Sequence, residues 1–197
     1  DMKMAHQLGY ANVEPDATIY AYVVNTLTKS GSIHAAEQAF DILTQVEARF
    51  AETGSPAFQP TSLLYSAVLQ AYAKSSTPDG AQKAETLLRR NLKWFAAGKK
   101  FAQPTIQCYN AVIDAHARSG DIDAAKKAEA VLVELESSSI AKPNTRSYNA
   151  VILALKNSGA SPALAESCSK TGDIILHGPH HTAVKSTKTG VSPSINS

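Results

Sequence analysis

The sequence predicts an all-α solenoid built from tandem helix-turn-helix repeats. One observation is self-similarity, because four segments align without gaps and each follows a proline. The other is the recurrence of apolar residues at i, i+3, i+4 and i+7 within each segment, which marks one face of an amphipathic α-helix. The four segments are DATIYAYVVNTLTKSG (16–31), TSLLYSAVLQAYAKSS (61–76), TIQCYNAVIDAHARSG (105–120) and NTRSYNAVILALKNSG (144–159).

The prolines set the period of the repeat. They are Pro15, Pro60, Pro104 and Pro143, spaced 45, 44 and 39 residues apart, within the range of helical solenoids. The residue after each proline can cap a helix N-terminus, and these residues are Asp16, Thr61, Thr105 and Asn144. We therefore expect the first helix of each unit over 17–30, 62–74, 106–118 and 145–157.

A second helix is expected after each short turn. Its apolar positions superpose between units, as Ala36/Ala39/Leu43, Ala81/Ala84/Leu88 and Ala125/Ala128/Leu132. The expected ranges are 33–52, 79–96, 122–138 and a frayed 161–168, with surplus residues in loops over 53–59 and 96–103. Because the turns are short, the two helices of a unit pack antiparallel, and stacked pairs share one core.

The repeats divide the chain into 16–60, 61–104, 105–143 and an incomplete fourth unit at 144–168. Residues 1–15 are expected to end a preceding repeat. The segment 169–197 is rich in Ser, Thr, Gly and Pro, so we expect a disordered tail.

Composition and motifs exclude several classes of protein. Charged residues make up 18% of the chain and the net charge is +2, which gives no strong electrostatic signature. Cys108 and Cys168 form neither a CxxC motif nor a disulfide framework, so a reducing compartment is expected. No apolar run approaches the roughly 18 residues of a membrane helix, and we expect no membrane partner. Phosphate-loop, HExxH and GxSxG motifs are missing, so we expect no enzyme, no cofactor and no small-molecule substrate.

The histidines do not predict a metal site. His116 replaces an apolar residue of its helix stripe and is expected to be a core or rim histidine. His177, His180 and His181 lie close together, but in a Gly- and Pro-rich segment without a second set of ligands.

The run Pro-x-x-x-x-Tyr-Asn-x-Val-Ile-x-Ala, followed by Lys/Arg-x-Gly and Ala-x-x-Ala, resembles the pentatricopeptide repeat family. Residues 104–128 and 143–164 carry the best copies, and the resemblance covers about residues 1–167. The family period is about 35 residues, so these units are longer than usual. The extra residues follow the first helix of each unit in the sequence. The resemblance implies a right-handed α-solenoid that binds single-stranded RNA, with each base read by two or three side chains.

The resemblance also implies which residues read the bases. They follow the motif tyrosine and the next unit's proline, which gives the pairs Ala21 with Thr61, Ser66 with Thr105, and Asn110 with Asn144, and leaves Asn149 unpaired. Asn110 with Asn144 matches the family's pyrimidine combination, with cytosine favoured. Ser66 leans towards a purine, whereas Ala21 cannot make a side-chain hydrogen bond and is not expected to discriminate.

Two further rows are implied by the resemblance. Thr18, Leu63, Gln107 and Arg146 would flank the bases, and Leu63 alone has the aliphatic character that the family prefers there. Lys29, Lys74 and Arg118 precede the turn, where the family contacts phosphates. The alternatives are structural: residues after proline cap helices in any case, and cations near a helix C-terminus stabilise its dipole.

Two functions follow from these observations. The first is sequence-selective binding of single-stranded RNA in a mitochondrion or plastid, supporting RNA processing, stability or translation. The alternative is a protein-interaction scaffold, or a subunit of a ribosome-like assembly, with protein partners. A basic stripe along the face that carries the reading residues favours RNA, and an apolar or mixed face favours protein.

Overall fold

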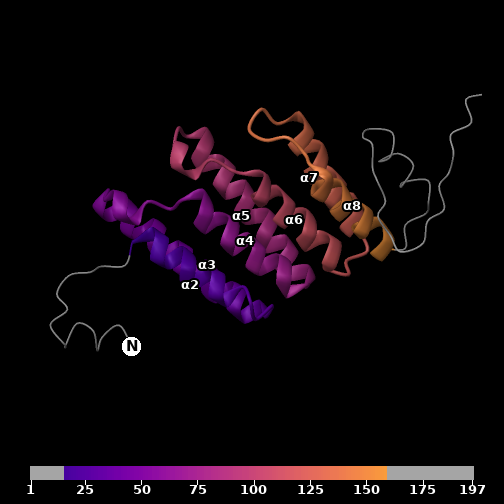
Figure 1. Cartoon of the computed structure of the whole chain (residues 1–197), viewed down its shortest axis with the longest axis horizontal. Coiled ribbons are helices and arrows are strands. Elements are labelled where there is room, and N and C mark those ends of the chain that lie inside the picture. The colour runs from indigo at the N-terminus through magenta and orange to yellow at the C-terminus, as the bar shows by residue number, and fades with distance from the viewer. Residues whose placement is uncertain (1–15, 159–197) are drawn as a thin grey trace, which may run out of the picture.

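The computed structural model describes residues 16–158, which form helices and turns without a β-strand. The elements are α2 (Ala17–Leu27), α3 (Ile33–Thr53), η1 (Pro56–Phe58), α4 (Ser62–Ser75), α5 (Pro78–Ala96), η2 (Lys100–Ala102), α6 (Ile106–Arg118), α7 (Ala124–Ser137) and α8 (Thr145–Asn157). Figure 1 shows them stacked along the long axis, from α2 and α3 at one end to α7 and α8 at the other. The predicted all-α fold is confirmed. The expectations for residues 1–15, the helix over 161–168 and the tail over 169–197 lie outside the described residues.

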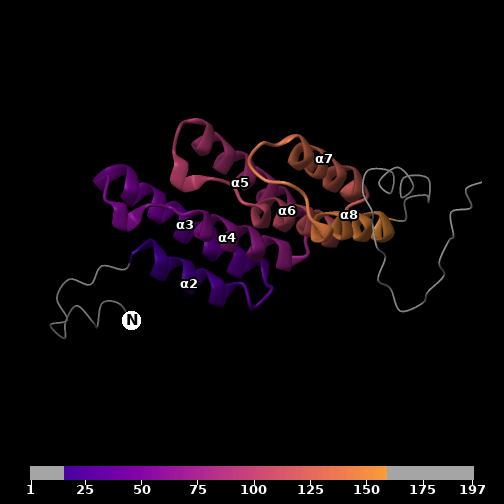
Figure 2. The ribbon, with the colours of Figure 1, turned by 45° about the horizontal axis from the view of Figure 1, so that its top comes forward.

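The helices form two layers, as a solenoid requires. The first helices α2, α4, α6 and α8 pack on one another in order, and each second helix packs between its own first helix and the next one. In Figure 2, α5 and α7 lie above α6 and α8. One continuous core results, and its largest fully buried side chains include Leu43, Leu64, Tyr65, Leu69, Leu88, Tyr109, Ile113 and Leu135.

Small residues allow the close approach of these helices. The alanines that align between units are buried on the first helices (Ala71, Ala115, Ala154) and on the second helices (Ala36, Ala39, Ala81, Ala84, Ala125, Ala128). A larger side chain at these places would force neighbouring backbones apart, because the core is close-packed.

The turn inside each unit needs a left-handed residue. Gly31 and Gly120 have φ of 65° and 70°, and Ser76 adopts φ of 52° at the aligned place. Glycine adopts this conformation without a steric penalty, which explains why it recurs at the end of the aligned segments.

Three of the four expected N-caps are confirmed. Asp16, Thr61 and Asn144 accept the backbone N–H three residues later, at 2.9, 3.4 and 3.2 Å. Thr105 stands at the N-cap position of α6, but its side chain makes no capping hydrogen bond, so the fourth prediction is wrong. Its hydroxyl lies 3.5 Å from the thiol of Cys108 instead.

Two helix ends differ from prediction by two residues or more, because side chains capture the backbone. The helix over 17–30 ends at Leu27, where the hydroxyls of Thr28 and Ser30 donate to the carbonyls of Asn25 and Leu27. Such local bonds compete with helix continuation. The helix over 122–138 begins only at Ala124, after a turn in which the hydroxyl of Ser119 and the carboxylate of Asp121 each accept a backbone N–H.

The surplus residues of the lengthened units are ordered. Single 3₁₀ turns, η1 and η2, replace the expected loops. The buried side chain of Asn91 donates to the carbonyl of Ala102 at 2.8 Å, and the Phe101 ring packs edge-on against Phe50 with centroids 5.1 Å apart. Both turns therefore pack beside the ends of α3 and α5 and leave the exposed side of the first helices uncovered.

The packing of the core predicts that the effect of an alanine-to-leucine substitution on stability depends strongly on its position along α7. Ala128 is fully buried and Ala130 is exposed on the same helix. Ala128→Leu is expected to overpack the α6–α7–α8 contact and lower the free energy of unfolding by roughly 1–3 kcal/mol. The matched change Ala130→Leu should shift it by less than about 0.5 kcal/mol. Urea unfolding followed by circular dichroism measures both, and equal effects would show that the buried face of α7 is assigned wrongly.

Candidate nucleic-acid interface

The three expected reading residues on α2, α4 and α6 lie between neighbouring first helices. Ala21, Ser66 and Asn110 are 0%, 7% and 4% exposed. Asn110 therefore does not project into an open groove. The residue after the motif tyrosine is turned towards the next first helix, and α6 and α8 pack too closely to leave it open. Asn149, at the same place on α8, is exposed.

One of the three expected pairs meets through its side chains. The amide of Asn110 donates to the carbonyl oxygen of the Asn144 side chain at 3.4 Å. In the preceding pair, the Ser66 hydroxyl donates to the carbonyl of Leu63 at 2.9 Å and does not bond Thr105. Ala21 has no polar side-chain atom to offer Thr61.

Ser147 completes the Asn110–Asn144 pair. Its hydroxyl donates to the side-chain oxygen of Asn110 at 2.6 Å and accepts the backbone N–H of Asn144 at 3.1 Å. Asn144 caps α8 in return, so the two residues form a reciprocal capping box. Ser147 is fully buried, which shields these bonds from water.

The exposed side of the first helices carries three aligned rows of side chains, which we call the first-helix face. They are Thr18, Leu63, Gln107 and Arg146; Asn25, Gln70, Asp114 and Leu153; and Lys29, Lys74, Arg118 and Asn157. Leu63, expected to flank a base, is 51% exposed. Arg146, from the same row, forms an ion pair with Asp114 at 2.7 Å, so its charge is balanced within the protein.

The cations at the end of the first helices differ from Lys83 and Arg89 on the second helices. Lys29, Lys74 and Arg118 are exposed, and none forms an ion pair within residues 16–158. On the second helices, Lys83 bonds Glu37 and Asp79, both at 2.8 Å, and Arg89 pairs with Glu85 and Glu134. Unbalanced positive charge therefore recurs at the end of the first helix in the first three units, and Asn157 takes this place in the fourth.

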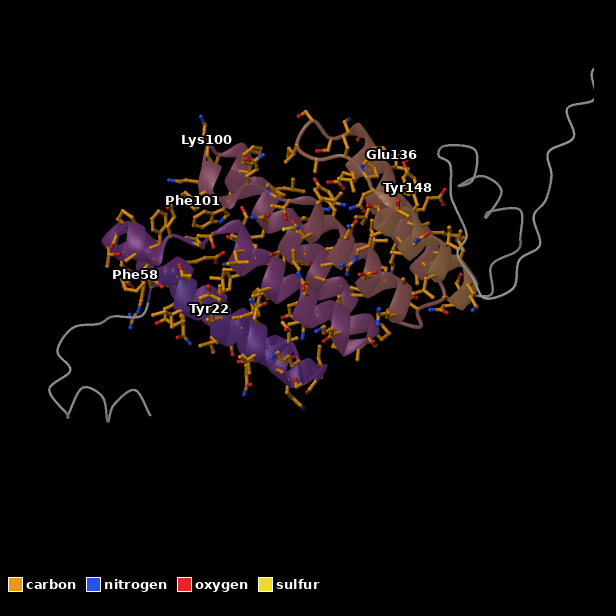
Figure 3. The ribbon with its side chains drawn as sticks, viewed as in Figure 1. Tyr22, Phe58, Lys100, Phe101, Glu136 and Tyr148 are labelled. Carbon is orange, nitrogen blue, oxygen red and sulfur yellow. The ribbon has the colours of Figure 1, made fainter. Side chains whose placement is uncertain are left out.

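Contacts also tie the motif tyrosines to the second helices. The hydroxyl of Tyr65 donates to the buried carboxylate of Glu47 at 2.5 Å, and Tyr148 donates to Glu136 at 3.1 Å. Figure 3 shows Glu136 and Tyr148 beside each other, and Tyr22 exposed on α2. These bonds fix the pitch from one unit to the next, on which the spacing of the basic row depends.

His116 is a core histidine, as predicted. It is 2% exposed, and its Nε2 lies 3.2 Å from the carboxylate of Glu85. Burial lowers the pKa of His116 below its ordinary value, and the negative charge of Glu85 opposes that shift only in part.

This shift predicts a pH dependence of stability. The folded pKa of His116 is below the unfolded value of about 6.5, so the stabilisation is complete above that pH and is lost as the pH falls through the folded value. His116→Gln should flatten the decline in the urea midpoint between about pH 7.5 and 5.5. The exposed His34→Gln variant should keep the wild-type decline, and an unchanged decline in His116→Gln would contradict this assignment.

The described residues offer little support for a nucleophilic cysteine, a metal site or a membrane-spanning helix. Cys108 is buried, and burial raises the pKa of its thiol, which disfavours the nucleophilic thiolate. Residues 16–158 contain no group of three His, Cys, Asp or Glu side chains able to hold a metal ion. In the same range no helix is both long and apolar enough to cross a membrane. The histidines at 177, 180 and 181 lie outside it.

Sequence reasoning missed Ser147 and Asp114. A polar residue three positions after an N-cap is the signal of a capping box, and it could have drawn attention to Ser147. Asp114 lies seven residues after Gln107, two turns along the same side of α6, which would have placed it on the exposed face.

The comparisons agree with the aligned units. The model of the pentatricopeptide repeat family matches residues 107–138, which include most of α6 and all of α7. No curated protein and no solved structure shows significant similarity to the chain. The matched unit, its three aligned counterparts and the all-helical fold together support a relationship to the pentatricopeptide repeat family, with one of the four units matched by the family model.

Proposed function

We propose that this chain binds single-stranded RNA along the first-helix face, and that it supports RNA processing, stability or translation in an organelle. The observation that carries the proposal is the row of Lys29, Lys74 and Arg118, exposed and without ion pairs within residues 16–158. Equally placed cations on successive units suit a polymer with one phosphate per nucleotide.

The remainder of the first-helix face suits unpaired bases. Asn25, Gln70 and Gln107 offer amides, which carry both donors and acceptors, and exposed Leu63 offers an apolar surface. Single-stranded RNA presents its base edges for such contacts, whereas the major groove of an RNA duplex is too narrow for side chains. The acidic residue of this face, Asp114, is neutralised by Arg146.

The Asn110–Asn144 pair supports selectivity in this proposal. It is the pair whose side chains touch, and exposed Asn144 lies at the N-terminal end of the first-helix face. Phosphate contacts supply affinity without sequence information, so the base preference must come from side chains of this kind.

Titration of labelled oligoribonucleotides that differ at one position tests the proposal. Asn110→Ala is expected to weaken binding of the preferred sequence by roughly 1–3 kcal/mol and to flatten the base preference at one position. Arg118→Ala should weaken all sequences alike and lower the salt slope by about 0.7. Thermal melts check that both variants fold. If the wild type and its variants bind no RNA but bind partner proteins, the result would favour the alternative function of a protein-interaction scaffold.

A further inference from the structure

A hydroxyl at the centre of the Asn110–Asn144 pair fixes both amides. Ser147 donates to the side-chain oxygen of Asn110 at 2.6 Å. The side-chain oxygen of Asn144 lies 3.2 Å from the same hydroxyl, and it accepts the backbone N–H of Ser147 at 3.2 Å and the Asn110 amide at 3.4 Å. Both amide oxygens are thus engaged within the protein.

The engaged oxygens decide which atoms remain for a ligand. An amide has one acceptor oxygen and one donor nitrogen, on opposite sides of the same carbon. With the oxygen of Asn144 held against the N-terminus of α8, its nitrogen points away from the helix, and this nitrogen makes no hydrogen bond within residues 16–158. Flipping the Asn144 amide would place its nitrogen against the backbone N–H of Ser147, and flipping the Asn110 amide would place the two amide oxygens against each other, so either flip loses a hydrogen bond beside a buried residue.

We propose that Ser147 is a positioning residue that makes this unit read a base by N–H donors alone; the inference rests on the proposed RNA binding. The Watson–Crick edge of cytosine has adjacent acceptors at O2 and N3. In uracil N3 carries a proton, which would face the donor nitrogen of Asn144. The orientation set by Ser147 therefore favours cytosine over uracil at this unit.

The other units lack this device. Ile19, Leu64 and Cys108 stand where Ser147 stands, three residues after the N-cap. An aliphatic side chain has no hydroxyl, and the Cys108 thiol lies 3.5 Å from the Thr105 hydroxyl and does not bond Ser66 within the described residues. Amide orientation is consequently specified at the junction of α6 and α8 and not at the two preceding junctions.

Two substitutions at Ser147 and one matched control test this role. Ser147→Ala removes the hydroxyl with little change of volume, and Ser147→Thr retains it. Cys108→Ala removes the corresponding atom of the preceding unit. For each folded variant and the wild type, affinities are measured for two single-stranded RNAs that differ by cytosine or uracil at the position read by this unit.

We expect the wild type, Ser147→Thr and Cys108→Ala to prefer cytosine, and Ser147→Ala to lose at least about fivefold of that preference. In the protein without RNA, Ser147→Ala should also move the side-chain amide resonances of Asn110 and Asn144 in ¹H–¹⁵N spectra. A preference unchanged in Ser147→Ala, or absent in a wild type that binds RNA, would overturn the role of Ser147 and leave RNA binding intact. A wild type that binds neither RNA would overturn the proposed function itself.

Discussion

Replacing Arg90 with methionine is expected to lower the free energy of unfolding by about 2–4 kcal/mol. Arg90 on α5 forms an ion pair with Glu47 of α3, whose side chain is buried in the core. Without Arg90 the carboxylate keeps the hydroxyl of Tyr65 as a donor but has no compensating charge. The estimate is below that for a fully buried pair, because the Arg90 side chain is partly exposed.

A second substitution separates charge from packing. Methionine keeps an apolar stem like that of Arg90 but removes the guanidinium, whose central carbon lies 5.7 Å from the centre of the Phe40 ring. The double variant Arg90→Met, Glu47→Gln has no charge to compensate, and its amide oxygen still accepts from Tyr65. It should recover most of the lost stability in urea unfolding experiments. If Arg90→Met alone unfolds at the wild-type midpoint, the carboxylate of Glu47 is solvated and the pair does not join α3 to α5.

The helices could be predicted because their signals are local. The apolar stripe around Tyr109, with Thr105 before it and Gly120 after it, defines α6 within one unit, and the structure has α6 at the predicted residues. Repetition reinforced the signal, since an error in one unit would have broken the alignment with the other three. The start of α7 was missed because Asp121 forms a local turn that the apolar pattern does not contain.

Contacts between units could not be predicted in the same way. Lys83 with Glu37 and Arg89 with Glu134 join residues 46 and 45 positions apart, about one repeat. Each such residue reads as a solvated charge on its own helix, and only the stacking distance brings the partners together. The order of η2 depends likewise on Asn91, a polar residue buried by a turn eleven residues later.

The sequence predicted which residues of the candidate site lie together, but it did not predict how exposed their side chains are. Asn110 and Asn144 lie together as expected, yet the depth of Asn110 depends on how closely α6 approaches α8. That distance is set by Ala111, Ala115 and their counterparts on α8, which the sequence shows to be small without showing the resulting gap. The hydrogen bond from Ser147 to Asn110 depends on the same gap.

Removing the basic row is expected to have the largest effect on binding. If Lys29, Lys74 and Arg118 each contact one phosphate, their combined replacement by alanine lowers the salt slope for single-stranded RNA by about 2. At about 0.1 M salt this corresponds to roughly a hundredfold loss of affinity. Because all three side chains are exposed, the fold should be unaffected, and circular dichroism melts verify this.

The matched control removes the same charge elsewhere. Lys93, Lys99 and Lys100 are exposed at and after the end of α5, and Figure 3 shows Lys100 at the outer edge of the array beside Phe101. None of the three forms an ion pair within residues 16–158. Their replacement by alanine lowers the net charge by the same amount as the replacement of the basic row. It therefore measures how much RNA affinity depends on total charge alone, whatever the position of the charges.

The salt dependence of RNA affinity in the wild type and these two triple variants tests most directly whether RNA lies on the first-helix face. We expect the Lys29, Lys74 and Arg118 variant to lose about 2 units of salt slope and most of its affinity, and the Lys93, Lys99 and Lys100 variant to stay close to the wild type. Equal losses in the two variants, or a larger loss in the second, would contradict the account, because the bound strand would then not follow the first helices.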